Sequence, residues 1–370
     1  MASPATNQIV MLQGMGINER VWARLVSGFG RVTLIQQGMI QHTEVWDHGV
    51  RVFNGPETSV VSTRKWDEAT FSALTIRRSL ARVREQLRGQ QVDVIVASNY
   101  NMGLAALWLR RRGKAKRVIV FVTDFLPLRG SLAVRIHRWI TARLNRLACR
   151  HADEVWSLSP RIPFMQANPN SFVVPIAMED QPVPAVNREE IGYIGYPTAD
   201  HALEILFEIC RKHRFRLNLV GNSPYLDSIK HLAPADTVFH GMISDTAKIN
   251  QVMARCFCGY AVYRNTGPQG YSYYGFPSKT FAYFATHTPF VTTMTAHFSP
   301  EFEKRGIACV VEPRSEDIEA AILRMRANFS QYREAIARFL VTWNEEVLRF
   351  HRERLAANGI RVETGASPGS

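Results

Sequence analysis

Short apolar runs, separated by longer amphipathic stretches, recur along the whole chain. In the first half these runs are residues 8–13 (QIVMLQ), 32–36, 50–53, 92–97 (VDVIVA), 118–122 (VIVFV), 154–158 and 172–176. Near-continuous apolar runs of this length are typical of parallel strands buried on both faces of a sheet. The stretches between them have apolar residues at helical spacing. This alternation predicts an α/β fold that begins with a Rossmann-like unit.

The same alternation restarts after residues 177–190, which are rich in proline and acidic residues, as a domain boundary should be. The second set of strands is expected at residues 191–195, 217–220, 238–241, 258–263, 290–293 and 308–311. We therefore expect one Rossmann-like domain at residues 1–178 and another at residues 188–330, with parallel sheets that face each other across a ligand-binding cleft. A final helix, residues 331–358, is expected to cross back to the first domain.

Composition and charge indicate a folded protein with an anionic partner. No apolar run reaches the roughly 18 residues that span a bilayer, and the N-terminal residues lack the pattern of a signal peptide. The net charge is +13, and the first 180 residues contain 24 Lys and Arg against 13 Asp and Glu. A basic half of this kind is typical of proteins that bind nucleic acid, anionic lipid or a phosphorylated substrate.

Five cysteines lie in apolar or helical contexts, and Cys256 and Cys258 share one apparent strand. We expect free thiols in a reducing cytosol, with a metal or disulfide role as the alternative.

Residues 132–150 are predicted to form a basic amphipathic helix. Leu132, Ile136, Trp139 and Ile140 recur at helical spacing, and arginines surround them. One interpretation is a helix whose apolar face packs on the core while its basic face meets solvent. The other is that this helix, or the arginine-rich stretch at residues 77–88, rests on an anionic membrane surface.

Residues 271–291 (YSYYGFPSKTFAYFATHTPFV) combine a Tyr- and Gly-rich loop, the tripeptide Pro277-Ser278-Lys279 and an apolar helical run. Proline suits the start of a helix, where the first N–H groups have no intrahelical partner. Those groups, the helix dipole, the Ser278 hydroxyl and the Lys279 ammonium would hold a phosphate. An ordinary capped surface helix is the alternative.

An ordered set of motifs resembles the GT-B glycosyltransferases, which use nucleotide-sugar donors. The motifs are VTDFLP at 122–127, ADEVWSLSP at 152–160, IGYIG at 191–195, LVGNSP at 219–224, VFHGMIS at 238–244 and PSKTFAYFATHTPFV at 277–291. Within that class the chain resembles most the inverting, membrane-associated enzymes of bacterial exopolysaccharide assembly, such as the xanthan glucuronosyltransferase. The resemblance implies that Lys279 holds the donor diphosphate and that Asp124 is the catalytic base.

These roles suit an inverting transfer. One carboxylate takes the proton of the acceptor hydroxyl, and Lys279, Ser278 and the helix start neutralise the leaving diphosphate. We expect no cofactor and no metal, since the D-x-D type of acidic pair is absent from the sequence. The alternative for Asp124 is a helix cap.

One departure from the class concerns its retaining members. Many of those enzymes place two glutamates eight residues apart in this region, and the second binds the ribose. The matching positions here are Tyr274 and Ala282, which argues against the retaining pattern and leaves the ribose contact unassigned.

Further candidates come from residues that follow strands. Tyr196, Asn222, Tyr263, Tyr271 and Pro277 are expected to line the donor pocket, and Gly14, Gly16, Asn99, Tyr100, Asn101 and Arg129 the acceptor pocket. Each could instead be a turn, loop or core residue. His201, His240 and His287 are expected to be structural.

The sequence thus predicts a glycosyltransferase that moves a sugar from a nucleotide-sugar, expected to be a UDP-sugar, to a lipid-linked or other glycan. It would act in bacterial surface polysaccharide synthesis, on the cytoplasmic face of the plasma membrane, and bind no nucleic acid. The alternatives are a GT-B-like sugar-nucleotide epimerase, a basic nucleic-acid-binding protein without a recognisable binding motif, and a nicotinamide-dependent oxidoreductase that uses the Gly14–Gly16 turn.

Overall fold

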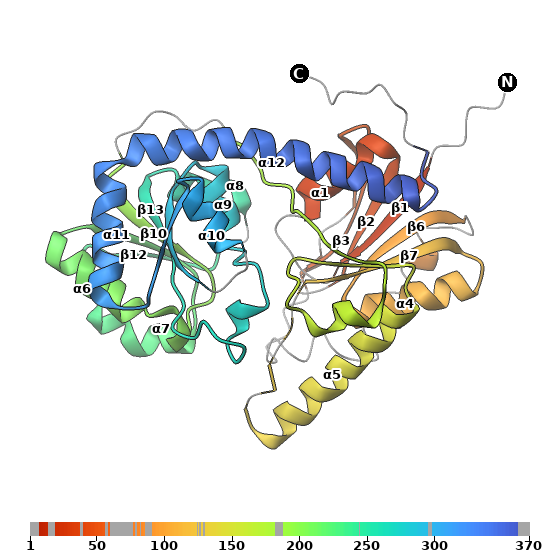
Figure 1. Cartoon of the computed structure of the whole chain (residues 1–370), viewed down its shortest axis with the longest axis horizontal. Coiled ribbons are helices and arrows are strands. Elements are labelled where there is room, and N and C mark those ends of the chain that lie inside the picture. The colour runs from red at the N-terminus through yellow and green to blue at the C-terminus, as the bar shows by residue number, and fades with distance from the viewer. Residues whose placement is uncertain are drawn as a thin grey trace. The chain divides into compact units, whose positions relative to one another are not determined.

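The computed structural model describes residues 7–13, 19–37, 40–55, 58–59, 77, 80–81, 83–85, 91–123, 125, 127–128, 130–181, 188–243, 245–294 and 298–361. Internal contacts divide the chain into two compact units (Figure 1). The first unit comprises Met1–Ala177 together with Glu345–Ser370, and the second comprises Met178–Asn344. None of the described helices combines the length and apolar character that a membrane crossing requires.

The first unit is built on a mixed sheet in the order β4-β3-β2-β1-β6-β7-β8-β9, with β5 paired to β3. The strands are β1 (Gln8–Gln13), β2 (Arg31–Gln37), β3 (Ile40–Asp47), β4 (Val50–Asn54), β5 (Thr58–Ser59), β6 (Val92–Ser98), β7 (Ala115–Val122), β8 (Glu154–Ser157) and β9 (Ser171–Val173). Strands β1, β2 and β6 to β9 pair in parallel, as their continuous apolar runs predicted.

Strand β3 had no prediction from the sequence, because its apolar residues are interrupted by polar ones. It runs antiparallel to β2 and β4. His48 and Gly49 form the turn between β3 and β4, both at positive φ (46° and 79°), which suits a tight hairpin. Strand β4 is exposed along its whole length at the edge of the sheet.

The helices of the first unit whose bounds the structure describes include α1 (Glu19–Val26), α4 (Asn99–Arg111) and α5 (Leu132–His151), with short 3-10 turns η1 (Ser27–Phe29) and η2 (Pro163–Ala167). Gly103 in α4 allows a close approach to its neighbours. A side chain there would meet Val120 of β7 at 3.1 Å and Ala148 of α5 at 3.2 Å. Helix α4 is therefore held between the sheet and the C-terminal half of α5.

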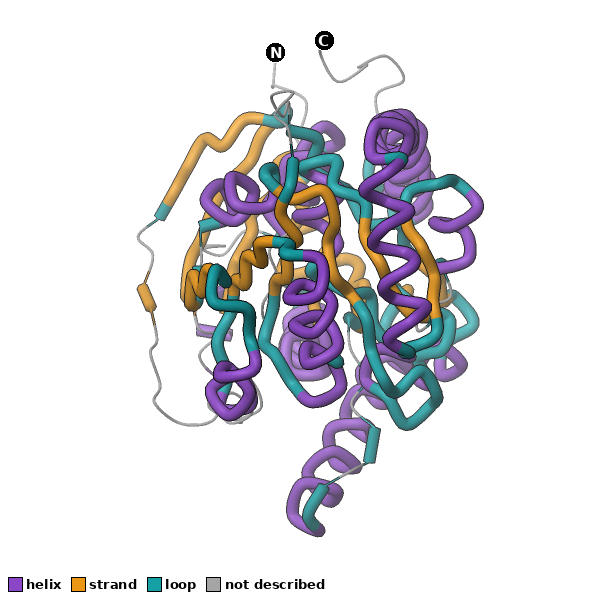
Figure 2. The backbone as a smooth tube through the Cα atoms, turned by 90° about the vertical axis from the view of Figure 1, so that its left-hand side faces the viewer, coloured by secondary structure: helices purple, strands orange, loops and turns teal. Residues whose placement is uncertain are grey.

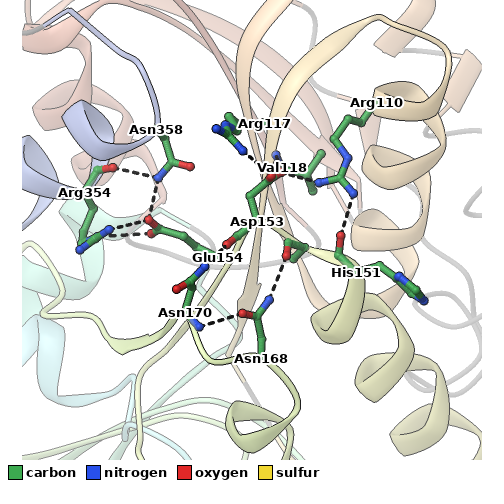
Figure 3. Close-up of polar contacts among 11 residues, drawn as sticks. Arg110, Arg117, Val118, His151, Asp153, Glu154, Asn168, Asn170, Arg354 and Asn358 are labelled. Carbon is green, nitrogen blue, oxygen red and sulfur yellow. Dashed lines mark hydrogen bonds and ion pairs between the residues drawn. The ribbon is translucent and has the colours of Figure 1, made fainter.

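Helix α12 (Phe329–Ala357) starts in the second unit and ends in the first. Within the first unit, Trp22 Nε1–H donates to His351 Nε2 at 2.6 Å. Glu154 accepts from Arg354 at 2.7 Å and from Asn358 at 2.8 Å (Figure 3). These contacts make the last turns of the chain an integral part of the first unit.

The second unit has a six-stranded, wholly parallel sheet in the order β12-β11-β10-β13-β14-β15. The strands are β10 (Glu190–Ile194), β11 (Arg216–Val220), β12 (Val238–Gly241), β13 (Cys256–Ala261), β14 (Phe290–Thr293) and β15 (Ala308–Val311). The helices are α6 (Leu203–His213), α7 (Pro224–Ile229), α8 (Thr246–Met253), α9 (Thr280–Ala285), α10 (Ser299–Lys304) and α11 (Ser315–Ala327), with 3-10 turns η3 (Ala199–His201), η4 (Lys230–Leu232) and η5 (Tyr271–Tyr273).

Helices cover both faces of this second sheet (Figure 2). One core layer joins the strands to α6 and α11, and the other joins them to α8, α9 and α12. All five cysteines are free and buried, as predicted. The prediction of an α/β chain with two Rossmann-like units is confirmed.

Candidate anion-binding site at the carboxyl edge of the second sheet

Two glycines end the central strands β10 and β11 and bring their backbones into contact. Gly195 and Gly221 have φ values of 129° and 137°. A Cβ on Gly221 would lie 1.8 Å from the carbonyl oxygen of Gly195, so no side chain fits between the two strand ends. Tyr196 and Asn222 follow these glycines and are exposed. Ligands of parallel α/β sheets bind at this carboxyl edge.

Lys279 reaches this edge from the turn before α9. Its side chain is buried, and within the described part of the chain its Nζ has no hydrogen-bond partner. The ammonium lies 4.5 Å from the ring centroid of Tyr193 and 4.9 Å from that of Tyr263. Cation–π contacts of this kind keep the group in place without satisfying its donors. Burial lowers the pKa of Lys279 to about 7, and the nearby Asp200 carboxylate opposes that shift.

The hydroxyl of Tyr193 is a second buried group without a partner among the described residues. It lies 3.8 Å from the position that a Cβ on Gly195 would take, and the Cε of Lys279 lies 3.7 Å from the same point. An ammonium and a hydroxyl donor therefore converge beside one glycine. Leaving buried donors unpaired is costly, and an anionic ligand is the chemical group that would satisfy both.

His201 forms a neutral wall beside these donors. Its ring centroid lies 5.7 Å from that of Tyr193 and 5.0 Å from that of Tyr263. Burial, followed by the charge of Lys279, lowers the pKa of His201 to about 2. Its Nδ1 accepts the backbone N–H of Thr198 at 3.0 Å. The imidazole is thus neutral at physiological pH.

Asp200 connects the loop after β13 to the segment that carries His201. Its carboxylate accepts the N–H of Asn265 at 2.8 Å, and its carbonyl oxygen accepts the N–H of Arg264 at 2.7 Å. The structure therefore adds Tyr193, Asp200, Gly195 and Gly221 to the residues around Lys279. Tyr193 lies within an apolar strand motif, so only the geometry identifies its unpaired hydroxyl.

A tight turn precedes helix α9. Helix α9 has six residues, and Lys279 lies just before it. The N–H of Thr280 donates to the carbonyl of Pro277 at 2.9 Å, and that of Phe281 to the carbonyl of Ser278 at 3.2 Å. A tight turn thus satisfies these two amides. Ser278 is exposed and Pro277 is buried, so Lys279 is the member of this tripeptide whose side chain is a buried donor without a partner among the described residues.

Several predicted residues lie outside the described residues. These are Gly14, Gly16, Asp124, Arg129 and the side chain of Tyr271. Among the described groups of three or more His, Cys, Asp or Glu side chains, none is arranged to hold a metal ion.

The predicted acceptor residues of the first unit separate into one half-exposed and two buried side chains. Asn99 has a φ of 57°, and its Nδ2 lies 3.4 Å from the Oγ1 of Thr123, at the end of β7. Tyr100 and Asn101 are buried. Asn99 is therefore the half-exposed member of this set, and it lies beside Thr123.

Comparisons with known proteins place the chain in a structural class. A family model described as a glycosyl transferase 4-like domain matches residues 18–162. None of the curated protein sequences matches the chain. Sucrose-phosphate synthase from Thermosynechococcus elongatus has a similar structure, with a TM-score of 0.67, 13% identity, and coverage of 95% of this chain and 100% of that one.

Two further solved structures are similar over nearly the whole chain. HepE from Anabaena, in complex with UDP, has a TM-score of 0.61 at 14% identity and covers 95% of this chain and 100% of its own. WaaG, a glycosyltransferase involved in lipopolysaccharide biosynthesis, has a TM-score of 0.58 at 12% identity and covers 97% of this chain and 100% of its own. The chain therefore has the GT-B fold of glycosyltransferases.

Proposed function

We propose that this protein is a glycosyltransferase that transfers a sugar from a nucleotide-sugar to a glycan acceptor. The observation that carries the proposal is the buried, unpaired ammonium of Lys279 beside the unpaired hydroxyl of Tyr193. A sugar nucleotide presents a diphosphate, which would accept hydrogen bonds from both groups. The donor is proposed to be a UDP-sugar, because HepE, a protein of the same fold, is described in complexes with UDP and with UDP-glucose.

The reaction is proposed to be inverting and metal-independent, as the resemblance to enzymes such as the xanthan glucuronosyltransferase implies. Asp124 would take the proton of the acceptor hydroxyl as that oxygen bonds to the sugar C1. The bond from C1 to the diphosphate oxygen would break, and Lys279 with Tyr193 would stabilise the negative charge of the leaving group. Tyr196 and Asn222, both exposed beside the glycines, would contact the remainder of the donor.

The acceptor is proposed to be a lipid-linked glycan of bacterial surface polysaccharide synthesis, reached by a protein bound to the cytoplasmic face of the plasma membrane. The first 180 residues carry the charge excess, which suits a lipid diphosphate and anionic lipid. Asn99 would contact the acceptor next to Asp124.

A thermal-shift screen of UDP-, GDP-, dTDP- and CMP-sugars tests the donor site. Ligand binding raises the melting temperature by mass action, so one class of sugar nucleotide should stabilise the protein. Lys279→Ala should abolish the shift, whereas Lys248→Ala, at an exposed position of the same unit, should leave it unchanged. An unchanged shift in Lys279→Ala would disprove the diphosphate assignment.

Product analysis distinguishes transfer from the alternative of a sugar-nucleotide epimerase. Transfer yields a free nucleoside diphosphate and an extended acceptor, whereas an epimerase yields a different sugar at the donor. Asp124→Asn should keep the donor shift and lose transfer. Wild-type turnover in Asp124→Asn would remove Asp124 from the role of base.

A further inference from the structure

Helix α5 presents its large apolar side chains to solvent and packs through its small and polar ones. The exposed residues form what we call the α5 stripe: Leu132 (71% exposed), Ile136 (51%), Trp139 (50%), Ile140 (45%) and Leu147 (45%). Steps of three, four and seven residues place them on one side of the helix. The buried residues of α5 are Asn145, Ala148 and Cys149. This arrangement is the reverse of an ordinary core-facing amphipathic helix, and the interpretation of an apolar face packed on the core is wrong for α5.

The stripe is a continuous surface on an extended element. Figure 1 shows α5 reaching beyond the other labelled elements of the first unit, with its N-terminal half at the far end. Fifteen residues separate Leu132 from Leu147, so the stripe is about 22 Å long at the rise of an α-helix. Exposed apolar surfaces of this kind mark interaction sites.

The charges of α5 indicate which partner suits the stripe. The helix contains no Asp or Glu, and its five arginines are Arg135, Arg138, Arg143, Arg146 and Arg150. The guanidinium of Arg143 lies 4.8 Å from the ring centroid of Trp139, inside the stripe. An apolar face mixed with arginines and tryptophan is the pattern of helices that lie in the headgroup region of an anionic bilayer. A second copy of the same helix would bring ten arginines together without a carboxylate on either helix to offset them.

We propose that the α5 stripe is the surface by which this protein docks on a membrane of anionic lipid, with the helix axis along the membrane plane. Leu132, Ile136 and Trp139 enter the acyl boundary, and the arginines contact lipid phosphates. This inference rests on the membrane location given under the proposed function, and is independent of the donor chemistry.

Vesicle flotation tests the apolar contribution. The wild-type protein should float with vesicles of phosphatidylcholine and phosphatidylglycerol, and far less with phosphatidylcholine alone. Trp139→Ala and Ile136→Ala should each weaken binding by about tenfold, because burying one large apolar side chain contributes about that factor. The matched control is Val341→Ala on α12, which removes a side chain of 60% exposure and should bind as wild type.

The same assay tests the charges. Arg135→Gln and Arg146→Gln should each weaken binding to the anionic vesicles by about fivefold, the factor for one basic residue near such a surface. Arg338→Gln on α12, where the side chain is 72% exposed, is the control. Added salt should release the protein from the vesicles.

Donor binding separates this inference from the proposed function. The stripe variants should keep the thermal shift with the sugar nucleotide, and Lys279→Ala should keep vesicle binding. Wild-type flotation of Trp139→Ala and Ile136→Ala would overturn the inference, as would equal binding to neutral vesicles. A dimeric wild type that becomes monomeric in Trp139→Ala, without binding vesicles, would also overturn it and make the stripe a contact between copies.

Discussion

The ammonium of Lys279 lies 4.5 Å from the ring centroid of Tyr193, and within the described part of the chain neither this ammonium nor the hydroxyl of that tyrosine has a hydrogen-bond partner. The ring holds the cation by its π face while both donors stay available. Because neither group is hydrogen-bonded within the described part of the protein, a bound anion would accept a hydrogen bond from each without displacing another partner.

Tyr193→Phe should therefore separate ligand binding from stability. The variant removes an unpaired buried hydroxyl, so the free energy of unfolding without ligand should be unchanged or higher. Affinity for the sugar nucleotide should fall by about 1.5–3 kcal/mol, the contribution of a hydrogen bond to a charged group. Calorimetric titration and chemical denaturation measure the two quantities. A variant that loses stability without ligand but keeps its affinity would show that the hydroxyl is structural.

Donor binding should take up a proton at alkaline pH. Burial lowers the pKa of Lys279 to about 7, so above that pH the amine of the free protein is mainly neutral. A diphosphate interacts with the charged form and raises that pKa, so affinity should fall as the pH rises above about 7. Titration calorimetry in buffers of different ionisation enthalpy, with an intact sugar nucleotide as ligand, measures the uptake. The same binding heat in every buffer would contradict this linkage.

His351 should make the first unit sensitive to acid. It accepts the Trp22 indole N–H, and burial lowers its pKa from 6.5 to about 3. Between these values the unfolded chain binds more protons than the folded one, so the free energy of unfolding falls as the pH falls, by about 1.4 kcal/mol per pH unit.

The variant His351→Gln keeps an acceptor and removes this titration. Its stability should fall less steeply than that of the wild type below pH 6.5, as measured by urea unfolding. His48→Gln, at a side chain that is 81% exposed, should follow the wild-type curve. Parallel curves of unfolding free energy against pH for wild type and His351→Gln would show that His351 does not cause the acid sensitivity.

Gly221→Ala should disrupt the carboxyl edge of the second sheet. Its Cβ would meet the carbonyl oxygen of Gly195 at 1.8 Å, and the φ of 137° is strained for alanine. We expect the free energy of unfolding to fall by about 3 kcal/mol or more. We also expect the thermal shift by the sugar nucleotide to be lost. Gly241→Ala has a positive φ of 66° but no atom within 4 Å of the added Cβ, so it should cost about 1 kcal/mol. Equal losses in both variants would show that the contact with Gly195 is unimportant.

The strands of the fold could be predicted from sequence wherever burial on both faces makes the apolar run continuous. Strand β3 could not, because four polar residues, Gln41 to Glu44, follow Ile40 and interrupt the apolar run. The orientation of α5 was equally hidden, since an apolar stripe has the same spacing whether it meets a core or is exposed. Tertiary packing decides that question: Ala148 lies against Gly103 of α4, and the buried residues of α5 are Asn145, Ala148 and Cys149.

The candidate site was predicted in part. The sequence indicated Lys279 as an anion ligand, and the structure places its ammonium, buried and unpaired, at the carboxyl edge of the sheet. It did not indicate Tyr193, because an unpaired hydroxyl is a property of three-dimensional surroundings. The amides of Thr280 and Phe281 donate within the preceding turn, a local geometry that the letters PSKTF do not specify. The roles of Asp124 and Arg129 stay predictions.

The passage of α12 from one unit to the other has a consequence for biosynthesis. Domains generally fold as they leave the ribosome, the N-terminal one first. Here Trp22 and Glu154 receive their partners His351, Arg354 and Asn358 only when synthesis is almost complete. The unit whose synthesis begins first therefore completes its folding last. A chain truncated before the end of α12 would leave the ribosome without the partners of Trp22 and Glu154.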